Sequence, residues 1–132
     1  MIFNKLIGSI PAIITPLNEN GTVNKALLQK IILRCLGSGC NGIMVAGSAG
    51  EGCVIPRAEY LKALETAVET VENKGIVVAC ISGLSYEDIQ LNVKTAVSVG
   101  ADAVLSVQPF YYPLNQEQIK DFFNKLADYS EL

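Results

Sequence analysis

The sequence predicts an α/β fold in which parallel strands alternate with helices along the chain. Three observations lead to this prediction. Short apolar runs recur along the 132 residues, longer segments with helical periodicity lie between them, and glycine or proline separates the two kinds of segment. The apolar runs span residues 10–14, 43–46, 76–81 and 103–107. Because they are almost continuously apolar, they are typical of strands buried on both faces of a parallel sheet.

Each apolar run is followed by a segment that carries a helix-start signal and one apolar face. We expect the first helix to start near Asn24 and end near Gly37 or Gly39, and the second to start near Pro56 and end near Gly75. The third should start near Ser85 with Asp88 and end near Gly100, and the fourth should start near Asn115. The side chains expected to face inward are Leu27, Leu28, Ile31, Ile32 and Cys35, then Leu61, Leu64, Val68 and Val71, then Ile89, Val93, Ala96 and Val97, and finally Ile119, Phe122, Phe123 and Leu126.

Two architectures fit four such units: part of a (β/α)8 barrel, or a small open doubly wound sheet. A whole barrel takes about 250 residues, so residues 1–132 suffice for about half of one, which we expect to form a single domain. Half a barrel has two open sheet edges and an uncovered inner face, and both favour association.

Composition excludes several classes of function. A formal net charge of −3 argues against nucleic-acid binding, and no apolar run approaches the ~18 residues of a membrane helix. The first residues lack a signal peptide's long apolar region, so we expect a cytoplasmic location. With no histidine and no CxxC among Cys35, Cys40, Cys53 and Cys80, we predict neither a metal site nor a cofactor, and we interpret the cysteines as reduced packing residues.

The chemistry is expected in the loops that follow the strands, because ligands of parallel sheets bind at the carboxyl ends of the strands. In the second loop, three glycines surround Ser48, which lets backbone N–H groups approach an anion such as a carboxylate; a plain turn is the alternative. In the fourth loop, Tyr111 could relay a proton, or it could be part of an aromatic lid or a subunit contact. Glu51 could act as a base, although we favour a carboxylate that ties down its own loop.

In order and spacing, these loops resemble those of the dihydrodipicolinate synthase and N-acetylneuraminate lyase family, over about residues 7–132. Residues 8–16 are similar to the family's opening strand with its Thr-Pro step. Gly47-Ser48-Ala49-Gly50-Glu51 is similar to its G-[ST]-T-G-E loop, and residues 109–112 resemble its tyrosine segment.

The resemblance implies a TIM barrel, of which this chain is the N-terminal half, and a lyase that joins pyruvate to an aldehyde, or releases it, through a lysine imine. Gly47, Ser48 and Ala49 would bind the substrate carboxylate, and Ser48 and Tyr111 would be catalytic as members of a proton relay. Thr15 and Glu51 would support the loop. The resemblance also implies a homo-oligomer, with Tyr111 at a subunit interface, and leaves the acceptor open among sialic acid, sugar-acid and aspartate-semialdehyde types.

Two departures from the family pattern matter. Ala49 replaces the usual threonine and loses a hydroxyl contact of order 1 kcal/mol. None of the lysines at positions 5, 25, 30, 62, 74, 94, 120 and 125 is predicted at a strand's carboxyl end, so we expect the Schiff-base lysine beyond Leu132.

Three hypotheses remain open. The chain could act with the other half of the barrel, in the same chain or as a C-terminal half-barrel partner. It could instead be a non-catalytic half barrel that associates with itself and either binds 2-keto acids or only assembles, or an unrelated small α/β binding domain.

Overall fold

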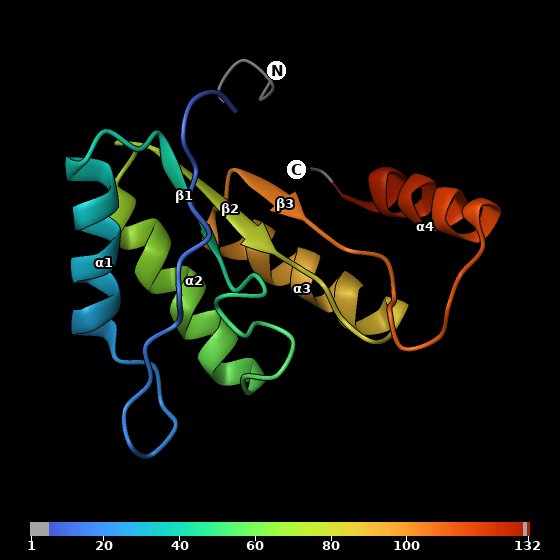
Figure 1. The fold of residues 1–132 in the computed structure, drawn as a ribbon, viewed down its shortest axis with the longest axis horizontal. Coiled ribbons are helices and arrows are strands. Elements are labelled where there is room, and N and C mark those ends of the chain that lie inside the picture. The colour runs from blue at the N-terminus through green and yellow to red at the C-terminus, as the bar shows by residue number, and fades with distance from the viewer. Residues whose placement is uncertain (1–5, 131) are drawn as a thin grey trace.

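The computed structural model describes residues 6–130 and 132, and within them a three-stranded parallel sheet is accompanied by helices (Figure 1). The elements in chain order are α1 (Lys25–Gly37), β1 (Gly42–Val45), α2 (Arg57–Val71), β2 (Ile76–Cys80), α3 (Tyr86–Val99), β3 (Ala103–Leu105) and α4 (Gln116–Tyr129). The strands pair in the order β1-β2-β3, with Ile43 opposite Val77 and Ala79 opposite Val104. Helices thus alternate with parallel strands, as the apolar pattern predicts.

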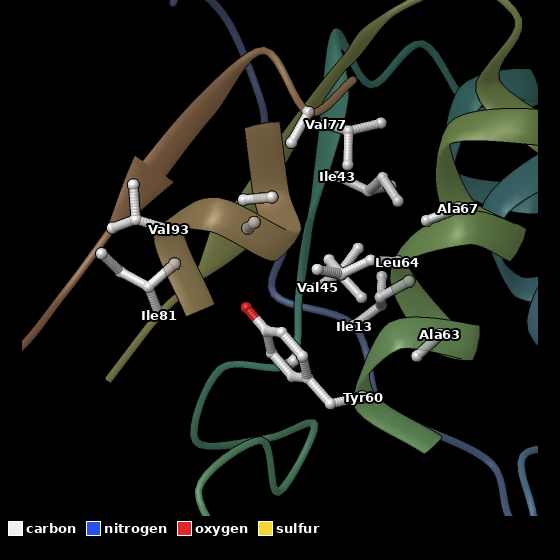
Figure 2. Close-up of a cluster of buried hydrophobic side chains, with 14 of the residues drawn as sticks. Ile13, Ile43, Val45, Tyr60, Ala63, Leu64, Ala67, Val77, Ile81 and Val93 are labelled. Atoms are coloured by element: carbon white, nitrogen blue, oxygen red, sulfur yellow. The ribbon is translucent and has the colours of Figure 1, made fainter. Parts of the chain in front are cut away.

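The two faces of the sheet differ in what covers them. Ile43, Val45, Val77 and Ala79 belong to the main core, which also contains buried residues of α1, α2 and α3 (Figure 2). Among the described residues, the opposite face carries a small cluster around Val78, with Met44 packed against it. This arrangement, with helices outside and a largely uncovered inner face, is that of a half barrel.

The first apolar run, residues 10–14, forms an edge segment and not the full strand that the sequence predicts. It lies parallel to β1 through a bridge between Ala12 and Met44, in which Ile13 N donates to Met44 O at 3.0 Å and Met44 N donates to Pro11 O at 2.8 Å. Pro11 has no N–H to extend this ladder toward the start of β1. The segment therefore occupies a strand position with a shortened ladder.

The helix-start signals are confirmed in three cases. The side chains of Asn24, Ser85 and Asn115 accept hydrogen bonds from backbone N–H groups of α1, α3 and α4, and Asn115 forms a full capping box with Gln118. Pro56 immediately precedes α2 as its N-cap, in agreement with a helix start near Pro56, but it makes no side-chain cap hydrogen bond. The predicted end at Gly100 is confirmed by its left-handed φ of 83°.

The expected inward faces are too wide. Leu28, Leu64, Val93 and Leu126 are buried, but Leu27 is 45% exposed and Val97 41% exposed. A helix on the outside of a single sheet contacts it along a narrow stripe, so apolar residues flanking that stripe remain at the surface.

No helix in the described part of the chain is both long enough and apolar enough to cross a membrane.

Candidate functional site

A hollow of about 880 Å³ lies over the inner face of the sheet, at the carboxyl ends of the strands. Its floor includes Met44, Cys80 and Leu105, which stand on the inner face of β1, β2 and β3. Its wall is formed by the loop after β1 and by residues of the segment after β3, up to Phe110. Glu51 is the only charged residue that lines it among the described residues, so the hollow is largely apolar.

The loop after β1, residues 47–52, is shaped by its own backbone. Gly50 N donates to Gly47 O at 3.0 Å, Glu51 N donates to Ser48 O at 3.2 Å, and Gly52 N donates to Gly47 O at 3.3 Å. The N–H groups of Gly47, Ser48 and Ala49 have no acceptor among the described residues. Ser48 and Ala49 are exposed and line the hollow, so two adjacent N–H groups without an acceptor belong to residues at its wall.

Close backbone packing holds the loop in place. Ala46 and Glu51 both adopt left-handed conformations, with φ of 58° and 54°, and turn the chain back toward the sheet. Thr15 Oγ1 donates to Gly50 O at 2.7 Å and ties the loop to the edge segment. A Cβ on Gly52 would overlap Ala46 O, so this position tolerates no side chain in the observed backbone.

The Glu51 carboxylate does not tie down its own loop, which is the role that the sequence favoured. Its side chain is exposed and its carboxylate makes no hydrogen bond to the described residues. Its backbone carbonyl instead accepts from Val54 N at 3.0 Å and Ile55 N at 3.1 Å. The loop is therefore stabilised by backbone groups and by Thr15, while the Glu51 carboxylate stands at the wall of the hollow.

Two free cysteines, Cys53 and Cys80, line the hollow. The interpretation as reduced packing residues is confirmed for Cys80, which is buried, but is wrong for Cys53, which is exposed. Cys80 is buried directly beneath the loop, where a Cβ on Gly47 would come within 3.2 Å of its Sγ, and this burial raises its pKa to about 11. Cys53 is exposed, and its Sγ lies 3.5 Å from Ser82 O; partial burial also raises its pKa. Both thiols therefore stay protonated near neutral pH and are poor nucleophiles.

Below the hollow, Tyr60 connects α2 to the end of β2. Its hydroxyl donates to Cys80 O at 3.0 Å, and the ring is packed among core side chains (Figure 2). Burial raises the pKa of Tyr60 well above its ordinary value, so its hydroxyl acts as a fixed donor. The end of β2 is thereby positioned under the loop.

Tyr111 is not brought into the hollow. Tyr111 and Tyr112 are 73% and 74% exposed, and their rings pack edge to face at 4.9 Å on the surface beyond β3. The structure thus places Gly47, Ser48, Ala49 and Glu51 together at the hollow, with Thr15 in contact with the loop at Gly50, but it leaves Tyr111 outside.

No lysine among the described residues lies in a loop at the carboxyl end of a strand. Lys74 precedes β2, at the opposite end of the sheet from the hollow, and the remaining described lysines lie on α1, α2, α3 and α4. Lys5 lies outside the described residues. Within the same part of the chain, no three His, Cys, Asp or Glu side chains gather into a possible metal site.

Comparison with known proteins places these features in a family. A family model described as the dihydrodipicolinate synthetase family matches residues 5–132. N-acetylneuraminate lyase of Citrobacter koseri is 32% identical over 126 residues, which cover 96% of this chain and 42% of the relative. 4-Hydroxy-tetrahydrodipicolinate synthase of Bartonella bacilliformis is 36% identical over 122 residues, 92% of this chain and 42% of the relative.

The solved structures agree with the sequence relatives. The crystal structure of dihydrodipicolinate synthase from Aquifex aeolicus superposes with a TM-score of 0.88 at 30% identity, covering 95% of this chain and 42% of that one. The chain therefore spans about two-fifths of the length of the relatives it matches. Its parallel βα units, its glycine-rich loop and these matches together show that the chain belongs to the dihydrodipicolinate synthetase family, with the fold of half a TIM barrel.

Proposed function

We propose that this chain provides the carboxylate-binding side of a lyase site that handles pyruvate, or a 2-keto acid that yields pyruvate, through a lysine imine. The observation that carries the proposal is the exposed turn at Ser48 and Ala49. Its N–H groups have no acceptor among the described residues and stand beside an apolar hollow at the carboxyl ends of the strands. Hydrogen bonds from such N–H groups to a carboxylate are charge-assisted, and their strength rises when the surroundings exclude water.

The proposal gives roles to Gly47, Ser48 and Ala49 of the loop, and to Thr15 and Tyr111 outside it. The N–H groups of Ser48 and Ala49 bind the carboxylate, and the absence of a side chain on Gly47 leaves room above Cys80. The Ser48 hydroxyl, which lines the hollow, passes a proton to or from the substrate. Thr15 acts on the loop through Gly50 and does not touch the substrate. Tyr111 joins the relay only as an interface residue of an oligomer, since its own chain leaves it at the surface.

The amine is the part of the site that the described residues do not supply. An imine requires a lysine at the hollow, where none of these lysines stands. We therefore propose that residues corresponding to the other part of the longer relatives contribute it, either in the same chain or as a separate half-barrel partner. A cytoplasmic location and a homo-oligomeric state belong to the same proposal.

Amide NMR tests the carboxylate site directly. Pyruvate is titrated into the ¹⁵N-labelled chain, and hydroxyacetone, which lacks the carboxylate, serves as the matched control ligand. We expect pyruvate, but not hydroxyacetone, to shift the amide resonances of Ser48 and Ala49. Equal shifts from both ligands, or pyruvate shifts that avoid residues 47–52, would overturn the proposed anion site.

Borohydride trapping tests the missing amine. The chain is incubated with pyruvate and sodium borohydride, which reduces an imine to a stable adduct, and its intact mass is measured. We expect no adduct on the chain alone. A stoichiometric adduct on one of its lysines would place the nucleophile within this chain and contradict the second part of the proposal.

A further inference from the structure

Two cysteines lie at the end of α1, on opposite sides of a tight turn. Cys35 is in the last turn of the helix, and Cys40 is the second residue after the cap at Ser38. Both are free thiols, and each is half-buried. Because Cys40 precedes β1, the pair lies at the opposite end of the strands from the hollow.

The turn between the two cysteines is a Schellman motif, which brings them together. Cys40 N donates to Cys35 O at 3.1 Å, and Gly39 N donates to Leu36 O at 3.0 Å, which are the two bonds that define the motif. Gly39 supplies the left-handed residue of the motif, with φ of 88°. The side chains joined by the outer of these bonds commonly contact each other, and in this chain both are cysteine.

The geometry of the turn suits a bond between the two sulfurs. Residues joined by a backbone hydrogen bond have Cα atoms about 5.5 Å apart in an antiparallel ladder, and a disulfide spans about 4.4–6.8 Å between its Cα atoms. The thiols also affect each other: burial raises the pKa of Cys35, Cys40 raises it further, and Arg34 opposes both effects. The backbone beside Cys40 is held as well, since Asn41 N donates to Ser9 O at 2.8 Å.

We propose that Cys35 and Cys40 form a reversible modification site, which a small-molecule disulfide such as oxidised glutathione converts to an intramolecular disulfide. The Cys40 thiolate attacks one sulfur of the oxidant, which leaves a mixed disulfide on Cys40 and releases one thiolate. The Cys35 thiolate then attacks Cys40 Sγ, forms the Cys35–Cys40 bond and releases the second thiolate. The two cysteine sulfurs are oxidised, the oxidant is reduced to two thiols, and the protons of the cysteines pass through solvent to the released thiolates.

The folded turn favours this bond over the alternatives. Because the Schellman motif already holds the two thiols together, closing the bond costs less conformational freedom in the folded chain than in the unfolded chain. Cys53 and Cys80 line the hollow at the other end of the strands, so they do not compete for Cys35 or Cys40 within the chain. For the same reason the site is independent of the proposed function.

Equilibration with mixtures of oxidised and reduced glutathione tests the site. After the remaining thiols are alkylated, digestion with trypsin and Glu-C releases residues 35–51, which contain Cys35 and Cys40, separately from residues 52–57, which contain Cys53. We expect the first peptide to be about 2 Da lighter than its reduced form and to escape alkylation. The equilibrium constant for closing the bond should be at least about tenfold larger in the native chain than in the same chain unfolded in about 6 M urea.

Gly39→Ala tests whether the turn is responsible, because it keeps both thiols. A Cβ at this position meets no atom within 4 Å, so the change acts through the left-handed backbone and should lower the native constant by about fivefold. The matched control Cys53→Ser should leave it within about twofold of the wild-type value. A native constant no larger than the one in urea would overturn the proposal. So would a disulfide that maps to Cys53 or Cys80, or a mixed disulfide on Cys40 that never closes.

Discussion

Substitution of Gly52 by alanine tests the packing that shapes the candidate site. A Cβ at this position would overlap Ala46 O and lie 2.7 Å from the Ala46 carbonyl carbon and 2.9 Å from its Cβ. Relief requires the loop backbone to move by roughly 1 Å from Ala46, because ordinary contacts of this kind are longer than about 3 Å. Two hydrogen bonds oppose this movement of the loop: Gly52 N donates to Gly47 O, and Thr15 Oγ1 donates to Gly50 O.

The expected cost is about 2–4 kcal/mol in the free energy of unfolding, at the upper end for overpacking because the clash is with backbone. Urea denaturation followed by circular dichroism measures it, and the midpoint should fall by about 1–2 M. The displaced loop should also bind pyruvate more weakly, as seen in the amide shifts of Ser48 and Ala49.

Gly37→Ala is the matched control. Gly37 is the last residue of α1, and a Cβ there would meet no atom within 4 Å. Alanine is the better helix former, so stability should stay within about 1 kcal/mol of the wild type and tend upward. If the free energy of unfolding of Gly52→Ala lies within about 0.5 kcal/mol of the wild-type value, the close approach of the loop to Ala46 does not constrain the fold, which would refute the prediction.

Three further predictions concern the same region. Tyr60→Phe removes the buried donor to Cys80 O and should lower the free energy of unfolding by about 1–2 kcal/mol in urea denaturation, and no loss would mean that this bond contributes nothing net. Burial raises the pKa of Cys80 to about 11, so between pH 9 and 11 the folded state keeps a proton that the thiol of the unfolded chain loses. The free energy of unfolding should therefore fall by up to about 3 kcal/mol as the pH rises from 9 past 11. Cys80→Ala should flatten that fall, and an unchanged slope would assign it to other groups. Ala49→Thr restores a hydroxyl at the turn and should tighten pyruvate binding by about fivefold in calorimetry, whereas unchanged affinity would place the carboxylate elsewhere.

Much of the fold was predictable because local signals and tertiary contacts agree. Asn24, Ser85 and Asn115 cap helices in the structure, and Gly100 adopts the left-handed turn expected of a helix end. The position and tight backbone of the loop containing Ser48 were predictable for the same reason, since its glycines mark a backbone that a side chain would obstruct. Of the two residues that the family resemblance implies would support this loop, Thr15 does so through Gly50 O, 35 residues away along the chain, whereas the Glu51 carboxylate does not.

The sequence by itself determined the order of strands and helices, the helix caps, the position of the glycine-rich loop and the family. These features depend on residues close together in the chain, on spacing and on local sequence motifs. Only the tertiary structure decided that residues 10–14 pair through a single bridge, that Cys80 lies beneath Gly47, and that Tyr111 stays at the surface. Those outcomes depend on contacts between segments distant in sequence, where backbone hydrogen bonding and close packing select one arrangement among several that the same local pattern permits.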